Sequence, residues 1–400
     1  MKIAIITLNN PCERTSGGIE SAVYNLSQGL SSLGHEVWII CLGKVKNDII
    51  EKKKGINLWV LPDKGTKGLF IRSLVFATYG KKVIHKLENS GIEVFNGQAG
   101  HSSILAFYKP KRAKVILTVH SMDGKNIADI KDCIRMRKLG ESFMEIIKYL
   151  IQRIWRIFYL SKSDYLIFVS RALQEEFKKY YWFLKKPSFL ISNGFPKINH
   201  SLTTTMKRYD FIYVGRLDKG KCVDLIITAS KILKDKGYKF SIAIVGDGPW
   251  KKDIEKLIHK YDLSKYIYLI GSLNQNDTMM YLLKSRFLIL CSLYEADPLV
   301  IREALSLGVP CIVSGIPILK EKIKYGFNGF LFRNESYKNL SIVLEKALNL
   351  TTEKYHEMSE NAKNSKGPSW IDVAKVYIKV FKFLVCNNKG EYFWKDTHPM

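Results

Sequence analysis

The sequence lacks both a long apolar run and an export signal. The longest stretch without Lys, Arg, Asp or Glu covers residues 304–319, and its two glycines and two prolines rule it out as a membrane-spanning helix. The apolar residues after Lys2 come without the basic leader, extended apolar region and small-residue cleavage site of a secretory signal peptide. We therefore predict a cytoplasmic protein without a transmembrane helix.

Patterns that bind metals or form disulfides are also missing. The seven cysteines are scattered, odd in number and contain no C-x-x-C pair, which argues against a zinc site and against a disulfide framework. No two aspartates stand two positions apart, so the D-x-D motif with which one class of sugar-nucleotide transferases holds a divalent metal is absent. We accordingly expect neither a metal nor another cofactor.

The glycine-rich motifs of common nucleotide-binding enzymes do not occur. A Walker P-loop and a dinucleotide-binding G-x-G-x-x-G are both absent, and the nearest glycine-rich pieces, Gly17-Gly18 and residues 246–248, fit neither pattern. Kinase and dehydrogenase functions are therefore poor hypotheses.

Positive charge, in contrast, is abundant. The chain has 63 Lys and Arg against 37 Asp and Glu, a net charge of +26. The first 200 residues hold 32 basic and 16 acidic side chains, and the last 200 hold 31 and 21, so the excess is larger in the first half. Such a balance suits nucleic acid, an anionic membrane surface, or polyanionic substrates such as sugar nucleotides, and composition alone does not choose among them.

Short β-branched runs alternate with longer segments of helical period, which indicates parallel sheets covered by helices. The predicted strands are residues 2–8, 37–41, 115–119 and 165–169 in a first series, and 211–214, 240–245, 266–270 and 287–291 in a second. The predicted helices are residues 19–33, 141–160, 223–236, 251–261 and 371–385.

A polar segment, residues 199–209, separates the two series and has the composition of a linker. We therefore predict an α/β protein with one domain over residues 1–200 and a second over residues 205–368. A final helix within residues 369–386, packing back toward the first domain, and a loosely ordered tail over residues 387–400 complete the chain.

The most informative segment is residues 295–310, EADPLVIREALSLGVP. Asp297 is suited to cap a helix that begins at Pro298, where the missing amide hydrogen costs nothing. This helix follows the predicted strand 287–291, so its free N-terminal amides would form an anion site at the carboxyl end of a parallel strand.

Two glutamates accompany this helix start: Glu295 before it and Glu303 within it. A carboxylate is an acceptor only and holds two hydroxyl groups, so both side chains are suited to bind a sugar. In the alternative interpretation, Glu295 is a solvated loop residue and Glu303 pairs with Arg302 or Lys320.

A second candidate site lies in residues 213–224, YVGRLDKGKCVD, a strand followed by a glycine turn. Arg216 and Lys221 project from this turn, and cations at the carboxyl end of a strand suit a pyrophosphate, which Arg binds with a planar fork and Lys as a point charge. The alternative is an ordinary basic turn in a lysine-rich protein.

These segments together resemble one family. GRLDKGKCVDLI, IVGDGP, EADPLVIREALSLGVPCIVS and EKIKYGFNGFLF, in this order, resemble the donor-binding domain of the retaining GT-B glycosyltransferases called group 1 or family 4. The first half is similar through SGGIESAVYNLSQGLSSLGHEV, VILTVHS, YLIFVSRAL and ISNGF. The resemblance implies two Rossmann-like domains that face each other across a cleft, the first binding the acceptor and the second the nucleotide sugar.

The resemblance also implies roles for individual residues of the second domain. Arg216 and Lys221 would hold the donor diphosphate, Glu303 the ribose hydroxyls, and Glu295, with a catalytic role, the hydroxyls of the transferred sugar. The helix start, Pro298, Leu299 and Val300, would also bind the donor.

In the first domain, the backbone of Gly17 and Gly18 would approach the phosphate closely, because glycine has no side chain. His120, the second catalytic candidate, would face the reacting centre. His101 competes with His120 for this role and is at best an acceptor-side residue. Two departures from the family pattern, Cys222 in place of glycine and Ala296-Asp297-Pro298 in place of a glycine-aromatic-glycine run, bear on the specificity for sugar and base.

The function that follows is transfer of a hexose from a nucleoside diphosphate sugar, with retention and without a metal. The expected acceptor is a saccharide or a lipid-linked saccharide in cell-surface polysaccharide or lipopolysaccharide synthesis. A GT-B sugar-nucleotide epimerase is the main alternative. A basic nucleic-acid-binding protein is a weaker one, and we expect no nucleic acid partner.

The basic first half suggests a further partner, an anionic membrane surface at the inner face of the cell membrane. Lys109, Lys111, Arg112 and Lys114 cluster in YKPKRAK, and residues 131–162 hold eight basic and three acidic side chains beside an aromatic and isoleucine-rich face. An equally good interpretation makes residues 141–160 a core helix whose outer face carries solvated basic side chains.

Overall fold

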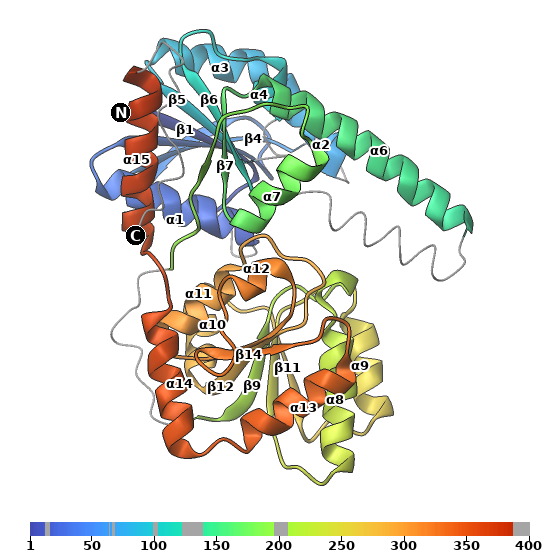
Figure 1. Ribbon diagram of the computed structural model, residues 1–400. Coiled ribbons are helices and arrows are strands. Elements are labelled where there is room, and N and C mark those ends of the chain that lie inside the picture. The colour runs from blue at the N-terminus through green and yellow to red at the C-terminus, as the bar shows by residue number, and fades with distance from the viewer. Residues whose placement is uncertain are drawn as a thin grey trace.

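The computed structural model describes residues 1–12, 17–63, 65, 69–98, 103–121, 139–195 and 207–386. These residues form two α/β halves, one above the other in Figure 1, each built on one sheet. The predicted tail 387–400 and most of the predicted linker 199–209 lie outside the described residues.

The first half is built on an eight-stranded sheet in the order β3-β4-β2-β1-β5-β6-β7-β8. Its strands are β1 (Lys2–Asn9), β2 (Glu36–Gly43), β3 (Ile49–Lys53), β4 (Ile56–Pro62), β5 (Val94–Gln98), β6 (Lys114–Val119), β7 (Tyr165–Phe168) and β8 (Ser188–Leu190). All neighbours pair in parallel except β3, which is antiparallel to β4. Strand β1 is buried over six consecutive residues, because helices cover both faces of the sheet.

Two apolar cores lie on the two faces of this sheet. The helices of the first half are α1 (Gly18–Ser32), α2 (Leu69–Thr78), α3 (Gly80–Asn89), α4 (Ser103–Phe107), α6 (Leu139–Lys162) and α7 (Arg171–Tyr180). Helix α1 belongs to one core, and α3, α4, α6 and α7 contribute to the other, with α6 on the outside of this half (Figure 1).

The second half has a six-stranded parallel sheet in the order β11-β10-β9-β12-β13-β14. Its strands are β9 (Tyr209–Val214), β10 (Ile242–Val245), β11 (Ile267–Gly271), β12 (Ser285–Leu290), β13 (Cys311–Ser314) and β14 (Gly329–Phe332). Its helices are α8 (Val223–Asp235), α9 (Lys251–Lys260), α10 (Gln275–Leu283), α11 (Leu299–Ser306), α12 (Pro317–Lys320), α13 (Tyr337–Leu348) and α14 (Thr352–Asn364). The strand order reverses between β9 and β12, and ligands bind at such a switch point in open α/β sheets.

The last described helix, α15 (Trp370–Cys386), returns to the first half and packs along α1 (Figure 1). The approach is close: a Cβ atom at Gly29 of α1 would lie 2.8 Å from the Trp370 carbonyl oxygen, so this contact needs a glycine. The segment before α15 is held by Phe195, whose amide donates to the Pro368 carbonyl at 3.0 Å. The last described helix, α15, thus completes one apolar core of the first half.

Helix α7 connects the two halves through two hydrogen bonds. The Ala172 amide at its first turn donates to Glu321 Oε1 at 2.9 Å, and the Tyr294 hydroxyl donates to Glu176 Oε2 at 2.6 Å. A carboxylate at the positive end of a helix is favourable, so Glu321 stabilises this arrangement of the halves.

Candidate functional site

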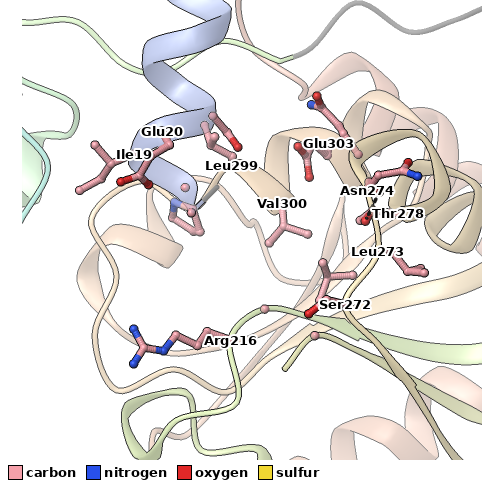
Figure 2. A pocket seen from close by; sticks show the side chains of 18 of the residues that line it. Ile19, Glu20, Arg216, Ser272, Leu273, Asn274, Thr278, Leu299, Val300 and Glu303 are labelled. Carbon is pink, nitrogen blue, oxygen red and sulfur yellow. Dashed lines mark hydrogen bonds between the residues drawn. The ribbon is translucent and has the colours of Figure 1, made fainter. Parts of the chain in front are cut away.

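A cleft of about 1030 Å³ lies between the two halves. Its walls come from the loops that follow β1, β9, β10, β11 and β12, together with the first turns of α1, α10 and α11. Nine of the ten predicted site residues line it: Gly17, Gly18, Arg216, Lys221, Glu295, Pro298, Leu299, Val300 and Glu303. Figure 2 shows Ile19 and Glu20 at the start of α1, and Arg216 and Glu303 on opposite sides of the pocket.

The turn after β9 places Arg216 in the cleft. The Tyr213 hydroxyl donates to the Arg216 carbonyl at 2.9 Å, and burial raises the pKa of Tyr213 well above its ordinary value, so this donor keeps its proton. The neighbouring β10 loop approaches so closely that a Cβ atom at Gly246 would lie 1.9 Å from the Gly215 carbonyl oxygen. The Arg216 side chain is 67% exposed, with Asp218 3.6 Å away, so it can reach an anion in the cleft.

Lys221 and Glu295 are in direct contact. Lys221 Nζ lies 2.5 Å from Glu295 Oε1, and the Ser292 hydroxyl donates to the same oxygen at 2.6 Å. The two side chains are 26% and 11% exposed, so little water screens the pair. The family resemblance gives Lys221 the donor diphosphate and Glu295 the hydroxyls of the transferred sugar, and these roles remain predictions.

Cys222 follows Lys221 and adopts a left-handed backbone, with φ of 49° and ψ of 45°. A residue with a Cβ atom is strained there and glycine is not, which is a physical reason for the glycine that the family resemblance places at this position. The conformation turns the chain from the short 3₁₀ helix Lys219–Lys221 into α8.

The start of α11 differs from the prediction. The cap residue is Pro298, the first helical residue is Leu299, and Pro298 forms no side-chain cap, so the assignment of Asp297 as the cap is wrong. Asp297 is instead buried and binds two cations, Lys322 Nζ at 2.6 Å and Arg302 Nη2 at 3.6 Å. The amides at the start of α11 therefore lie at the cleft without a side-chain cap, as an anion site requires.

Asp297 also joins the two halves. Its Oδ2 atom accepts a hydrogen bond from the Asn193 amide of the first half at 2.9 Å. Burial alone would raise the pKa of Asp297, but Lys322 and Arg302 outweigh it and hold the pKa below its ordinary value. The carboxylate is thus ionised and locked beside the helix start.

Glu303 lies one turn into α11, at the other end of the cleft from Arg216 (Figure 2). The alternative in which Arg302 neutralises it is wrong, because Arg302 binds Asp297. Burial raises the pKa of Glu303 to about 7, and a hydrogen bond with the Gln275 side chain offsets part of this effect. Glu303 therefore changes charge near neutral pH.

The first half contributes the start of α1. Its cap residue Gly17 has an extended backbone and makes no side-chain cap, so these amides also face the cleft. Glu20, which sequence reasoning did not single out, lines the cleft, is buried, and accepts a hydrogen bond from Asn9 Nδ2 at 2.6 Å.

Sequence reasoning also missed the wall near Glu303, formed by residues 272–275 and Thr278. Asn274 caps α10 by accepting from the Asp277 amide at 2.9 Å, and this N-x-x-D pattern was the signal that could have located the helix start.

His120 does not line the cleft. It follows β6, is 8% exposed, and its Nε2 atom lies 2.6 Å from Gln98 Oε1. Its role at the reacting centre remains a prediction, and the competing candidate His101 lies outside the described residues.

Two family models match the sequence and together extend from residue 16 to residue 365. The model described as Glycosyltransferase Family 4 matches residues 16–197, and the one described as Glycosyl transferases group 1 matches residues 195–365. The change from one match to the other falls shortly after β8, between the two halves of the structure.

Individual glycosyltransferases and solved structures are also similar to this chain. The gpi3 subunit of phosphatidylinositol N-acetylglucosaminyltransferase from Schizosaccharomyces pombe is 25% identical over 387 residues, which are 93% of this chain and 79% of that protein. Sucrose-phosphate synthase from Thermosynechococcus elongatus superposes with a TM-score of 0.77 at 17% identity, over 97% of this chain and 100% of that one. Anabaena Alr3699/HepE in complex with UDP and glucose gives 0.71 at 14% identity, over 96% and 99%. These two structures share the fold.

Proposed function

We propose, because this chain belongs to the group 1 glycosyltransferases and has the GT-B fold, that it transfers a hexose from a nucleoside diphosphate sugar with retention of configuration. The observation that carries the proposal is the meeting of two cations, Arg216 and Lys221, with the uncapped start of α11 in one cleft. Three positive features at one place suit the diphosphate of such a donor.

The donor diphosphate would lie between Arg216, Lys221 and α11, with Gly17 and Gly18 facing it from the first half. As the bond between the sugar and the diphosphate breaks, the phosphate oxygens gain negative charge, which these groups stabilise without a metal. Closure of the two halves would exclude water and so limit hydrolysis of the donor.

The two glutamates would orient the donor. Glu303, beside the wall formed by residues 272–275, would accept hydrogen bonds from the ribose hydroxyls, and Glu295 from hydroxyls of the transferred hexose. The acceptor hydroxyl would attack the anomeric carbon on the same face of the sugar from which the diphosphate departs. The proton of this hydroxyl would pass to the departing phosphate oxygen. His120 would lie near this centre.

We propose a saccharide or lipid-linked saccharide of cell-surface polysaccharide or lipopolysaccharide synthesis as the acceptor. The S. pombe relative, whose name specifies a phosphatidylinositol acceptor, supports an acceptor with a lipid part. The HepE structure, solved with UDP and glucose, supports a nucleoside diphosphate sugar as the donor.

A thermal-shift screen against UDP, GDP and ADP and their sugars tests the donor assignment. One nucleotide is expected to raise the melting temperature, because a ligand at about 100 times its Kd stabilises the folded state by about 2.7 kcal/mol. If none of the three raises it, the donor site is not where we place it.

The same screen has an expected pH dependence. With a pKa of about 7, Glu303 is mostly protonated at pH 6 and mostly ionised at pH 8, and only the carboxylate accepts at both oxygens. The rise in melting temperature, measured against the free protein at each pH, should be larger at pH 8. Glu303→Gln should remove this difference, and a pH effect that persists in the variant would contradict the assignment of Glu303.

The anomeric configuration of the product, read by NMR, tests retention. A sugar nucleotide that is converted without any acceptor would instead favour the epimerase alternative.

We further propose that one face of the first half binds an anionic membrane. Leu150, Ile151 and Ile154 of α6 are 49%, 47% and 67% exposed, so the interpretation of this helix as a core helix with a polar outer face does not hold for these positions. Trp182 and Phe183, in the loop after α7, are 75% and 44% exposed.

Arg153 of α6 links these two groups of apolar side chains, because its guanidinium donates to the Tyr180 carbonyl at 3.0 Å. The exposed basic residues Lys178, Lys179 and Lys185 flank the same loop. An apolar ridge with basic flanks suits the surface of an anionic leaflet. Among the described residues, no helix combines the length and apolarity needed to cross a membrane.

Sedimentation with vesicles of phosphatidylglycerol and of phosphatidylcholine tests this surface. Binding is expected to the anionic vesicles only and to weaken as salt rises, since salt screens exposed charges. Ile154→Ser should reduce binding. Ile342→Ser should not, because Ile342, an isoleucine of comparable exposure (59% against 67% for Ile154), lies on α13 of the other half. Equal loss in both variants, or binding to neither vesicle, would refute the assignment of this face.

A further inference from the structure

A row of buried polar side chains crosses the first sheet from its middle to its carboxyl edge. Asn96 and Gln98 belong to β5, Thr118 belongs to β6, and His120 follows β6. Asn96 is fully buried, and Gln98, Thr118 and His120 are 2%, 1% and 8% exposed. Buried polar groups in an apolar core are costly unless each finds a partner, so the direction of each hydrogen bond in this row is constrained.

The direction of the hydrogen bonds in this row is fixed at Asn96. Its Nδ2 atom lies 3.4 Å from the Ile116 carbonyl oxygen and 3.0 Å from Thr118 Oγ1. A backbone carbonyl accepts only, so the atom facing Ile116 must be the amide nitrogen. Asn96 Oδ1 therefore faces Gln98, and it also accepts from Thr118 Oγ1 at 3.4 Å.

The same reasoning passes to the next side chain. Gln98 Nε2 donates to Asn96 Oδ1 at 2.6 Å, and a flipped Gln98 amide would bring two acceptors together at that distance. An unmade hydrogen bond between buried groups is costly enough to hold the Gln98 amide in one orientation. Gln98 Oε1 consequently faces His120, 2.6 Å from the ring nitrogen Nε2.

We infer that Gln98 is a positioning residue, which keeps a proton on Nε2 of His120 and thereby makes Nδ1 the ring atom that gains or loses a proton. An oxygen that only accepts requires a proton on the nitrogen it faces, in both the neutral and the charged ring. The ring is thus oriented by a chain of hydrogen bonds that begins at the Ile116 carbonyl.

This inference deepens the proposed function, and its catalytic importance rests on the placement of His120 near the reacting centre. The protonation of Nε2 itself depends only on the buried row. The two parts are therefore tested by different measurements.

NMR of the protein labelled with ¹⁵N-histidine tests the ring state. His120→Asn identifies the signals of His120 by their loss. Nε2 is expected to show the shift of a protonated nitrogen, and Gln98→Glu should keep this shift, because the carboxylate still accepts from Nε2. Gln98→Leu, which removes the acceptor facing Nε2, should move this signal toward the shift of an unprotonated nitrogen. An unprotonated Nε2 in the native protein, or an unchanged ring in a folded Gln98→Leu variant, would overturn the inference.

Steady-state kinetics test the consequence for transfer. Gln98→Leu is expected to lower kcat by about 10²-fold, the loss typical of a misplaced group. The KM for the donor should not change, because the side chains that would hold the donor, Arg216, Lys221 and Glu303, lie in the second half. Gln98→Glu should recover most of kcat. Tyr377→Phe is the control. The Tyr377 hydroxyl of α15 lies 3.3 Å from Thr118 Oγ1, whereas the orientation of Asn96 is set by the Ile116 carbonyl. The protonation of the His120 ring and kcat should therefore not change in this variant.

The outcomes separate the two hypotheses. A protonated Nε2 in a protein that transfers no sugar would contradict the proposed function and support the ring assignment. A full kcat in Gln98→Leu would refute the positioning role even if transfer itself is established.

Discussion

Replacing Lys221 with alanine is expected to lower kcat for hexose transfer by about 10²- to 10³-fold, the loss typical of removing one group that stabilises charge in a transition state. Lys221 Nζ is 2.5 Å from Glu295 Oε1, at the edge of a cleft that also holds Arg216 and the start of α11. The substitution removes a positive charge where the leaving diphosphate gains negative charge. It also leaves the Glu295 carboxylate without its cation, which adds repulsion between that carboxylate and the donor.

Lys219→Ala is the matched control for Lys221→Ala. Lys219 belongs to the same 3₁₀ turn, is exposed, and lies over the Trp250 ring at 5.8 Å rather than in the cleft. The two variants lose the same charge from the same turn. Donor consumption and product formation should fall only in Lys221→Ala, and a normal rate in that variant would remove Lys221 from the diphosphate site.

Replacing Asp297 with alanine is expected to lower the free energy of unfolding by about 3–5 kcal/mol, because it leaves two buried cations without their counter-ion. The Asp297 side chain is fully buried, and the side chains of Arg302 and Lys322 are 8% and 12% exposed. The substitution also removes the acceptor for the Asn193 amide, a contact between the halves. Urea denaturation, monitored through tryptophan fluorescence, measures the change in the free energy of unfolding.

Asp235→Ala provides the comparison for Asp297→Ala. Asp235 pairs with Lys231 on the surface of α8, where its side chain is 54% exposed, and such pairs contribute about 0–1 kcal/mol. The pKa of Asp297 is held below its usual value, so its stabilising effect is present above about pH 4 and is lost as the pH falls through the folded-state pKa. Equal losses in the two variants would mean that the buried cluster is not a significant source of stability.

Much of the fold was predictable because its signals are local. The predicted strands and helices all occur, with ends that differ by no more than two residues, since continuous apolar runs and helical periodicity mark elements covered on one or both faces. Strand β9 begins at Tyr209, within the segment that we had assigned to the linker. The prediction did not include strands β3, β4, β5, β8, β13 and β14. Strand β3 lacks an alternation of apolar and polar residues, and most of its side chains are exposed, as expected for an antiparallel edge strand.

The candidate site was predictable only in part. Arg216, Lys221, Glu295 and the start of α11 could be located because they follow strands of the second sheet that end at the cleft. Gly17 and Gly18 were located only through the resemblance to a family. The cap assignment of Asp297 failed because Lys322, which binds it, is distant in sequence, and a local capping rule does not include such a partner. The arrangement around His120 was inaccessible for the same reason, since Gln98 is brought to it by the pairing of β5 with β6.

The position of α15 has a consequence for the order in which the protein can fold during synthesis. One of the two cores of the first half contains Trp370, Tyr377 and Phe381 together with residues of β1 and α1. These side chains are made after the whole second half, so at ~5–20 residues per second the ribosome needs roughly ten to forty seconds between the end of β8 and the start of α15. The second half, whose core needs nothing from α15, can therefore complete its core before the first half has completed both of its own, although the second half is synthesised later.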